Sequence, residues 1–288
     1  MIADFGNLGA AFLVTGVFAG LVYALGMASR GGALGGFVVG ILTYASLGPR
    51  GFTVLALFVA GGSLLTRLGY RSKERHGTAE ANGGRRGAGS AFANCGVALL
   101  CALLASLTGS GAFVVAFIAA LGAAFADTAE SEVGQLYSHA PRLITTFRKV
   151  PPGTNGAVSV VGTRVGLAAA VLTALLGLVL GLVTEPGIVL LITLAAFLGT
   201  VADSLIGALA PRVGHPFVRG GCLTRGVTLF WFLRRAGVDV ELCFGLDPAD
   251  GDGTDGHCWL VRDGQPFLER ADPRPRFAEI FRLPLERA

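Results

Sequence analysis

A cluster of acidic residues beside a glycine-rich turn is the part of this sequence best suited to chemistry. Asp127, Glu130 and Glu132 lie close together, and Lys149 and the turn Pro-Pro-Gly-Thr-Asn-Gly at residues 151–156 follow. Backbone N–H groups in a turn that leads into a helix form a binding site for anions. Mg²⁺ usually takes one or two carboxylates, and substrate phosphates and water complete its shell. The pattern therefore predicts a site for a phosphate and a divalent ion.

The carboxylates also have plainer structural interpretations. Glu130 and Glu132, taken singly, are typical of solvated loop charges, whereas on a helix Asp127 and Glu130 would share a face because they are three positions apart. Asp127 and Asp203 each stand at the end of an apolar run. A carboxylate in such a place either reaches the membrane interface or caps a helix, or it serves a function, because burying it unpaired costs several kcal/mol.

Apolar runs dominate the chain before residue 210. Of its 288 residues 52% are hydrophobic and 15% are charged, against about 25% charged in soluble domains, and the mean hydropathy is +0.65. A run of roughly 20 apolar residues crosses the hydrocarbon core of a bilayer. The runs at residues 8–28, 33–47, 51–65, 91–107, 112–126, 157–183 and 187–210 predict about seven transmembrane helices. The first run lacks a basic n-region and a convincing cleavage site, which favours a retained helix over a signal peptide.

The basic residues predict how this domain is oriented. Most of them lie in the loops 67–86 and 127–156. With seven spans these loops, Arg30 and the C-terminal tail fall on one side, which the positive-inside rule makes cytoplasmic. We expect a multi-pass protein of the cell inner membrane with its N terminus outside. The formal net charge of +4 is interpreted as this topology signal, not as a sign of nucleic-acid binding.

The charge density changes sharply near Pro211. Residues 1–210 hold 12 Lys/Arg and 8 Asp/Glu, whereas the much shorter segment 211–288 holds 11 and 11. A composition shift of this kind marks a domain boundary. We therefore predict an α-helical polytopic membrane domain over residues 1–210 and a small cytoplasmic α+β domain over residues 211–288.

The polar motifs of the membrane part resemble one family of integral membrane proteins, which includes plant phytyl-phosphate kinase. The matching segments are residues 66–70 with Lys73, 82–87, 93–96, 127–134, 150–156 and 199–204. The resemblance implies phosphorylation of a prenyl monophosphate at the membrane face, with Mg²⁺ and with CTP or another nucleoside triphosphate as donor. The partners implied are the lipid bilayer and the prenyl monophosphate.

On this resemblance, Asp127, Glu132 and Asp203 are the expected Mg²⁺ ligands. The residues expected to bind phosphate or nucleotide are Arg67, Lys73, Arg85, Arg86, Lys149, Gly153, Thr154 and Asn155. For the first basic loop, plain positive-inside bias is the alternative interpretation. The family normally continues past the Asp203 segment with a further membrane helix that carries an Asn-Asp motif, whereas this chain turns into a soluble tail. A truncated fusion without kinase activity is therefore a further alternative.

The tail contains a candidate cysteine nucleophile. Cys222 precedes an amphipathic helix that Gly237 is expected to end, and a helix N terminus lowers the pKa of a thiol. Strands are expected at residues 238–246, 257–261 and 266–269, with a hairpin turn at residues 263–264. His257 on the second strand could take the thiol proton, and Glu269, or Asp263 as second choice, could orient it.

The order Cys…His…acid, together with the motifs around these residues, resembles the transglutaminase-like cysteine peptidases that process lasso-peptide precursors. The resemblance covers residues 217–269 and implies a transglutaminase- or papain-like fold. It makes Cys222 the nucleophile, His257 the base and Glu269 the orienting acid, with a peptide as substrate. Two alternatives stay open. The membrane part could serve only as an anchor for a cysteine peptidase or amidase. A zinc site could use Cys222, Cys243, His257 and Cys258, although this spacing fits no usual pattern.

Overall fold

The chain divides into two compact units, Met1–Ile206 and Gly207–Ala288. The computed structural model describes residues 8–75, 77–138, 140–213, 227, 229–230, 233–235, 237–248, 256–269 and 272–283. Cys222 lies outside the described residues, so the predicted nucleophile has no described surroundings.

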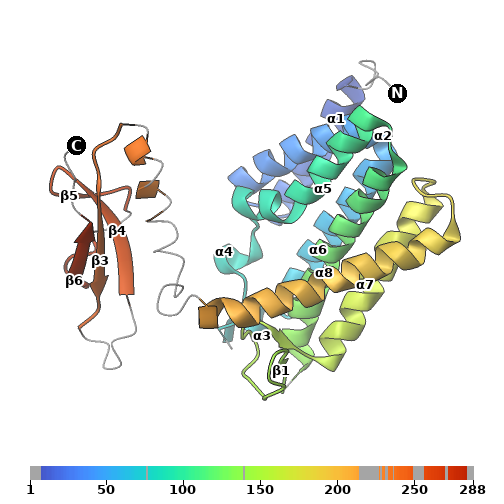
Figure 1. The fold of residues 1–288 in the computed structure, drawn as a ribbon. Helices are drawn as coiled ribbons and strands as arrows, with labels where there is room; N and C mark the ends of the chain where they lie inside the picture. The colour runs from blue at the N-terminus through green and yellow to red at the C-terminus, as the bar shows by residue number, and fades with distance from the viewer. Residues whose placement is uncertain are drawn as a thin grey trace. The chain divides into compact units, whose positions relative to one another are not determined.

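The first unit is a bundle of apolar helices (Figure 1). Its helices are α1 (Leu8–Ala24), α2 (Arg30–Arg67), α3 (Tyr70–Arg75), α4 (Ala81–Gly84), α5 (Ala88–Thr108), α6 (Gly111–Tyr137), α7 (Val160–Val179) and α8 (Pro186–Val213). Within the described part of the chain, five of them (α2, α5, α6, α7 and α8) are long and apolar enough to cross a membrane, and α1 is a shorter apolar helix. The prediction of a helical membrane domain is confirmed.

Helix α2 is broken in its middle and folds back on itself. Gly48 has φ +67° and ψ −165°, a left-handed conformation that favours glycine, and Pro49 after it has no N–H to continue the helix. The ring centroids of Tyr44 and Phe52 lie 5.9 Å apart, whereas eight residues of straight helix would rise about 12 Å. The two halves therefore pack against each other and correspond to the predicted runs 33–47 and 51–65. The count of seven spans stays a prediction.

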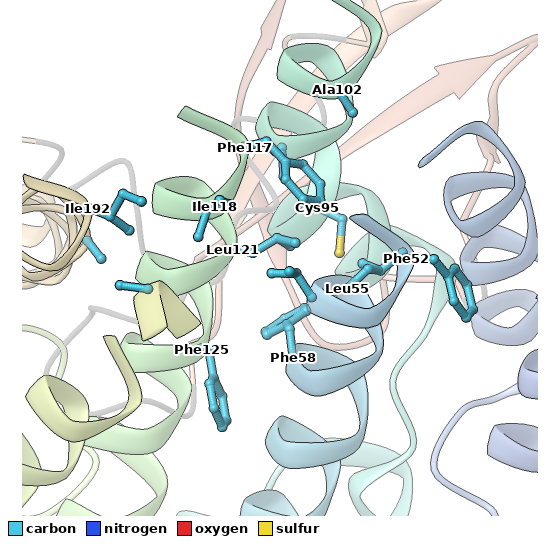
Figure 2. Close-up of a cluster of buried hydrophobic side chains, with 14 of the residues drawn as sticks. Phe52, Leu55, Phe58, Cys95, Ala102, Phe117, Ile118, Leu121, Phe125 and Ile192 are labelled. Carbon is cyan, nitrogen blue, oxygen red and sulfur yellow. The ribbon is translucent and has the colours of Figure 1, made fainter. Parts of the chain in front are cut away.

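The core of the bundle is built around α6. Phe117, Ile118, Leu121 and Phe125 of this helix are buried, and Figure 2 shows them beside side chains of α2, α5 and α8. Many core positions on the partner helices are alanine or glycine. Helices in lipid associate through close van der Waals packing, and small residues at the interface allow it.

The contact between α6 and α7 depends on two glycines. A Cβ added at Gly162 would lie 2.6 Å from the Glu130 carbonyl oxygen, and one at Gly166 would lie 3.1 Å from that of Ala126. The two glycines share a helix face because they are four positions apart. Ser159 caps α7 and accepts a hydrogen bond from the Gly162 N–H at 3.1 Å. This packing fixes the part of α6 that carries Asp127 and Glu130.

Gly162→Ala should therefore loosen the α6–α7 interface, since the added methyl group meets backbone that cannot move alone. We expect a loss of stability of about 1–3 kcal/mol, typical of overpacking, measured as a lower thermal unfolding midpoint of the purified protein. Gly96→Ala in α5 is the matched control, because no atom lies within 4 Å of its added Cβ and alanine favours a helix over glycine. Equal unfolding midpoints for the two variants would contradict this account.

The second unit contains a four-stranded antiparallel sheet. Its strands are β3 (Glu241–Leu246), β4 (Gly256–Arg262), β5 (Gln265–Phe267) and β6 (Ala278–Leu283), in the order β5-β4-β3-β6. Asp263 and Gly264 have φ of 51° and 76°, as a two-residue hairpin of type I′ requires. The first three strands were predicted, with slightly different ends, and β6 was not. A small region with strands is confirmed, and the transglutaminase- or papain-like fold stays a prediction.

The two faces of this sheet have different neighbours. Leu242, Cys258 and Leu260 form one cluster, against which Leu229, Phe230 and Leu233 pack from the helical segment. Cys243, Trp259 and Val261 form the cluster of the other face, with Phe277 packed against it. Gly237 has φ +78° and donates its N–H to the Arg234 carbonyl. It therefore ends the helical segment at the predicted residue.

Candidate functional site

A polar pocket lies at one end of the helical bundle, where α6, α7 and α8 meet the loop before α7. The space between its lining residues is ≈ 730 Å³, which includes space open to solvent. Helices α6 and α8 contribute Asp127, Glu130, Ser131, Gly134, Gln135, Asp203 and Ser204, and the loop contributes Pro141, residues 152–157 and Ser159. The structure thus brings together two predicted metal ligands, Asp127 and Asp203, and three predicted phosphate-binding residues, Gly153, Thr154 and Asn155.

Three carboxylates line this pocket, which we call the acidic pocket. Asp127 and Glu130 both line it from α6, as the spacing of three residues suggested, and Asp203 reaches it from α8. Asp203 lies close enough to Asp127 for their charges to interact. Glu130 accepts a hydrogen bond from the Thr163 hydroxyl at 2.9 Å, which ties it to α7. Glu130 belonged to the predicted acidic cluster, and its shared face with Asp127 was noted, but it was not among the expected Mg²⁺ ligands.

Two carboxylates of this pocket, Asp127 and Asp203, are the residues that could take part in holding a divalent cation. In the described part of the chain, no three His, Cys, Asp or Glu side chains are placed to hold a metal ion by themselves. Mg²⁺ prefers hard oxygen ligands and is commonly held by one or two carboxylates, with substrate phosphates and water as its other ligands. Asp127 and Asp203 supply such carboxylates, and the glycine-rich turn faces them across the pocket.

The glycine-rich turn lies within a short hairpin before α7. Strands β1 (Arg142–Leu143) and β2 (Ala157–Val158) pair across it, and Gly153 and Gly156 have φ of +84° and +74°, which favours glycine. The Thr154 hydroxyl donates to the Pro151 carbonyl at 2.7 Å. Lys149 belongs to the same hairpin and is exposed, but it does not line the acidic pocket.

The two basic loops meet at this end of the bundle. A Cβ added at Gly153 would lie 2.8 Å from the Thr78 side chain, so the turn touches the first basic loop. At the other end of the bundle, Arg50 lies 3.6 Å from the Cβ position of Gly181, next to the turn that follows α7. The side chains that sequence analysis placed on one membrane face therefore gather at one end. Which face this is stays a prediction.

Lys73 and Glu132 form a buried ion pair away from the pocket. The Lys73 side chain is 1% exposed and that of Glu132 is 12% exposed. The Lys73 ammonium donates to Glu132 at 2.5 Å and to the carbonyls of Thr66 and Leu65 at 2.8 and 3.2 Å. All three of its N–H groups are thereby used. We therefore leave Lys73 and Glu132 out of the proposed site, although both were predicted to bind ligands.

The three predicted arginines lie at the two ends of the first basic loop, Arg67 at its start and Arg85 and Arg86 at its end. Arg67 donates to the Leu25 carbonyl at 2.6 Å, and the guanidinium of Arg85 lies next to Gly26. Arg86 packs over the Phe58 ring at 5.7 Å and donates to the Thr128 hydroxyl at 3.4 Å. Since Thr128 follows Asp127 on α6, Arg86 is the arginine that the structure places beside the acidic pocket.

In the tail, two members of the predicted catalytic set lie together. His257 Nε2 is 3.5 Å from Glu269 Oε2, and the imidazole stacks on Phe277 and Trp259 with ring centroids 5.2 and 6.1 Å apart. His257 shares the sheet face of Trp259, because side chains alternate along a strand. The described helical residues pack on the opposite face. The contact between Cys222 and His257 stays a prediction. Asp263, the second choice, is at the hairpin tip beside Arg262.

The alternative zinc site is not supported by the sheet. Cys243 and Cys258 belong to the clusters on its two opposite faces, so one ion cannot bind both thiols. Cys243 lies on the face of His257, where burial raises the pKa of its thiol to about 11. The alternative that used Cys222, Cys243, His257 and Cys258 together was wrong, because Cys258 lies on the opposite face of the sheet from Cys243 and His257.

The sequence pattern of the family described as "Integral membrane protein DUF92" matches residues 13–228, and the chain belongs to this family of integral membrane proteins. The uncharacterized membrane protein sll0875 of Synechocystis is 39% identical over 175 residues, 60% of this chain and 67% of that protein. The chloroplastic protein VTE6 of Arabidopsis thaliana is 34% identical over 206 residues. That match covers 70% of this chain and 58% of VTE6.

The uncharacterized membrane protein MJ0933 of Methanocaldococcus jannaschii is 34% identical over 64% of this chain and 74% of that protein. The pattern of the transglutaminase-like superfamily matches residues 206–282, a similarity confined to the tail. No solved structure matches this chain.

Proposed function

We propose that this chain is a membrane-embedded kinase that transfers the γ-phosphoryl group of a nucleoside triphosphate to a prenyl monophosphate. The observation that carries the proposal is the acidic pocket, which joins Asp127 and Asp203 to the glycine-rich turn at the polar end of an apolar bundle. The resemblance of the membrane part to the phytyl-phosphate kinase family and its similarity to VTE6 support the same reaction.

The reaction asks mainly for positioning and for neutralisation of charge. A phosphate oxygen of the prenyl monophosphate attacks the γ-phosphorus, the bond from that phosphorus to the β–γ bridging oxygen breaks, and the products are a prenyl diphosphate and a nucleoside diphosphate. Mg²⁺, when bound, would neutralise the phosphates of the donor. Asp127 and Asp203 would hold the ion, the N–H groups of residues 153–155 would bind phosphate oxygens, and Arg86 would face the second anion. CTP is the donor that the resemblance favours.

The geometry of the bundle supports a seven-span arrangement. Each half of α2, before and after Gly48, would be about 27 Å long, close to the roughly 30 Å of a bilayer core. With α1, these halves and α5 to α8, the chain would cross seven times. The basic loops and the acidic pocket would then share one face. We propose that this face is cytoplasmic, on the inner membrane of the cell, because Lys and Arg concentrate on it.

The test is a transfer assay on membranes that contain the protein. With a γ-labelled nucleotide, Mg²⁺ and farnesyl or phytyl monophosphate, label should pass into the lipid diphosphate, most efficiently from CTP. If none of the four ribonucleoside triphosphates gives labelled lipid, the proposal fails.

The paired His257 and Glu269 favour a second candidate function for the tail, a cysteine peptidase or amidase with Cys222 as nucleophile. The similarity of residues 206–282 to the transglutaminase-like superfamily supports it. In this alternative, the membrane part would act as an anchor and a peptide would be the substrate. Processing of a lasso-peptide precursor is the specific form that the sequence motifs suggest.

A thiol-reactive peptide probe should label Cys222 with an apparent pKa below about 7.5, because an imidazole beside a thiol stabilises the thiolate. The other cysteines should give little background at neutral pH. Cys95, Cys243 and Cys258 are buried and Cys101, on α5, is partly buried. Burial raises the pKa of Cys243 to about 11. His257→Ala should slow the labelling, measured by mass spectrometry of the modified peptide over a pH series. Labelling of Cys222 at an unchanged rate in His257→Ala would argue against an activated nucleophile.

A further inference from the structure

A second, apolar pocket lies within the bundle between α1, the two halves of α2 and α5. The space between its lining residues is ≈ 700 Å³, which includes space open to the surroundings. The side chains that line it are almost all apolar, and they include Phe18, Val39, Phe52, Leu55 and Phe58. This apolar pocket is separate from the acidic pocket, and the two have no lining residue in common.

The apolar pocket extends along the helices and ends at an arginine. On the second half of α2 its lining runs from Phe52 to Ser63, a rise of about 16 Å. Arg86 is the one charged side chain in this lining. The same guanidinium donates to Thr128, the neighbour of Asp127. Arg86 therefore lies between the apolar pocket, which it lines, and the part of α6 that carries Asp127.

We infer that the apolar pocket holds the single isoprenoid chain of a prenyl monophosphate, with the phosphate of that substrate bound by Arg86. The inference rests on the proposed kinase function and adds where the substrate lies. An elongated apolar cavity that ends at a lone cation matches a molecule with one apolar chain and one terminal anion. Burial contributes about 0.8 kcal/mol for each CH₂ group, so a longer chain binds more tightly until the pocket is filled. Arg86 fixes the phosphate end on the side of the phosphoryl donor.

A larger side chain at Gly36 would fill part of the apolar pocket. Gly36 belongs to the lining, and a Cβ added there meets no atom within 4 Å, so a larger side chain would occupy the cavity without displacing the helices. Gly32 is less suitable, because its added Cβ would collide with the Arg86 carbonyl. Gly20 on α1 is the matched control. It is exposed, lies outside the lining, and also has nothing within 4 Å of an added Cβ.

The experiment measures binding of labelled farnesyl monophosphate and isopentenyl monophosphate to the purified protein in phosphatidylcholine nanodiscs. Gly36→Leu should weaken farnesyl monophosphate binding at least about tenfold, because the leucine takes the place of several buried CH₂ groups. It should leave isopentenyl monophosphate binding within about twofold, since the short chain stays near Arg86. Gly20→Leu should bind both ligands as the wild type does.

Two outcomes would overturn the inference. One is an unchanged affinity of Gly36→Leu for farnesyl monophosphate, and the other is displacement of that ligand by an equimolar two-chain phosphatidic acid, which would assign the pocket to a bilayer phospholipid. Because binding requires no phosphoryl transfer, the test is independent of the kinase assay. A protein that binds as predicted but transfers no phosphate would contradict the proposed function and leave the binding site standing.

Discussion

The Asp127→Asn protein should fold normally and lose phosphoryl transfer. Asp127 faces the acidic pocket from α6, beside Glu130 and Asp203, where its charge would help to hold Mg²⁺ against the phosphates. Removing one preorganised group that stabilises charge in a transition state commonly lowers kcat by about 10²–10³-fold. Asparagine has nearly the same shape, so the packing of α6 should be preserved. The measurement is kcat for prenyl diphosphate formation at saturating nucleotide and lipid, with the thermal midpoint as a check on folding.

Glu185→Gln is the control for this prediction. Glu185 is exposed, lies immediately before α8, and is not among the residues that line the acidic pocket. The same loss of one negative charge there should leave kcat within about twofold. If Asp127→Asn keeps wild-type kcat, or if Glu185→Gln loses as much activity, the acidic pocket is not the transfer site.

The Lys73→Met protein should be strongly destabilised, whatever the activity of the chain. Lys73 joins the end of α2 to Glu132 on α6 and also satisfies two carbonyls of α2. Removing one partner of a buried ion pair leaves the other charge uncompensated and costs about 3–5 kcal/mol. For a domain of this size we expect the thermal unfolding midpoint to fall by about 10 °C.

A double substitution that removes both charges tests the cause of this effect. Lys73→Met/Glu132→Leu should recover a large part of the lost stability, because the double variant leaves no unpaired charge and apolar replacements of buried pairs are often tolerated. Lys149→Met is the matched control, since Lys149 is the other lysine of the chain and is exposed. A double variant no more stable than Lys73→Met would show that the ion pair is not the reason for the loss.

The sequence located much of the acidic pocket because charged groups in an apolar chain must gather where water or a partner is present. Asp127 and Asp203 close two different apolar runs, so both were expected at helix ends. In the structure α6 continues past Asp127 to Tyr137 and α8 continues past Asp203 to Val213, and the packing of these helices brings the two carboxylates together. The break in α2 falls at Gly48-Pro49, between the two runs predicted at residues 33–47 and 51–65. The pairing of Lys73 with Glu132 could not be predicted from the sequence, because a contact across 59 positions depends on how α3 docks on α6.

In the tail, the local sequence pattern predicted one turn correctly but missed a strand. Hairpin chemistry at Asp263-Gly264 correctly predicted the turn between β4 and β5, because two positive φ angles suit this dipeptide. Strand β6 was missed, since all six of its residues are exposed and its sequence lacks the alternation of a half-buried strand. The zinc alternative failed for a related reason. Assigning Cys243 and Cys258 to opposite faces requires the register of β3 on β4, in which Phe244 pairs with Cys258.

The central claim is that this chain itself moves a phosphoryl group from a nucleotide to a prenyl monophosphate. The most direct measurement is the product stoichiometry of the purified wild-type protein in lipid bilayers, supplied with CTP, Mg²⁺ and farnesyl monophosphate. A kinase predicts one farnesyl diphosphate for each nucleoside diphosphate formed. Nucleotide consumption with release of inorganic phosphate only, or no consumption with any nucleotide, would contradict the claim.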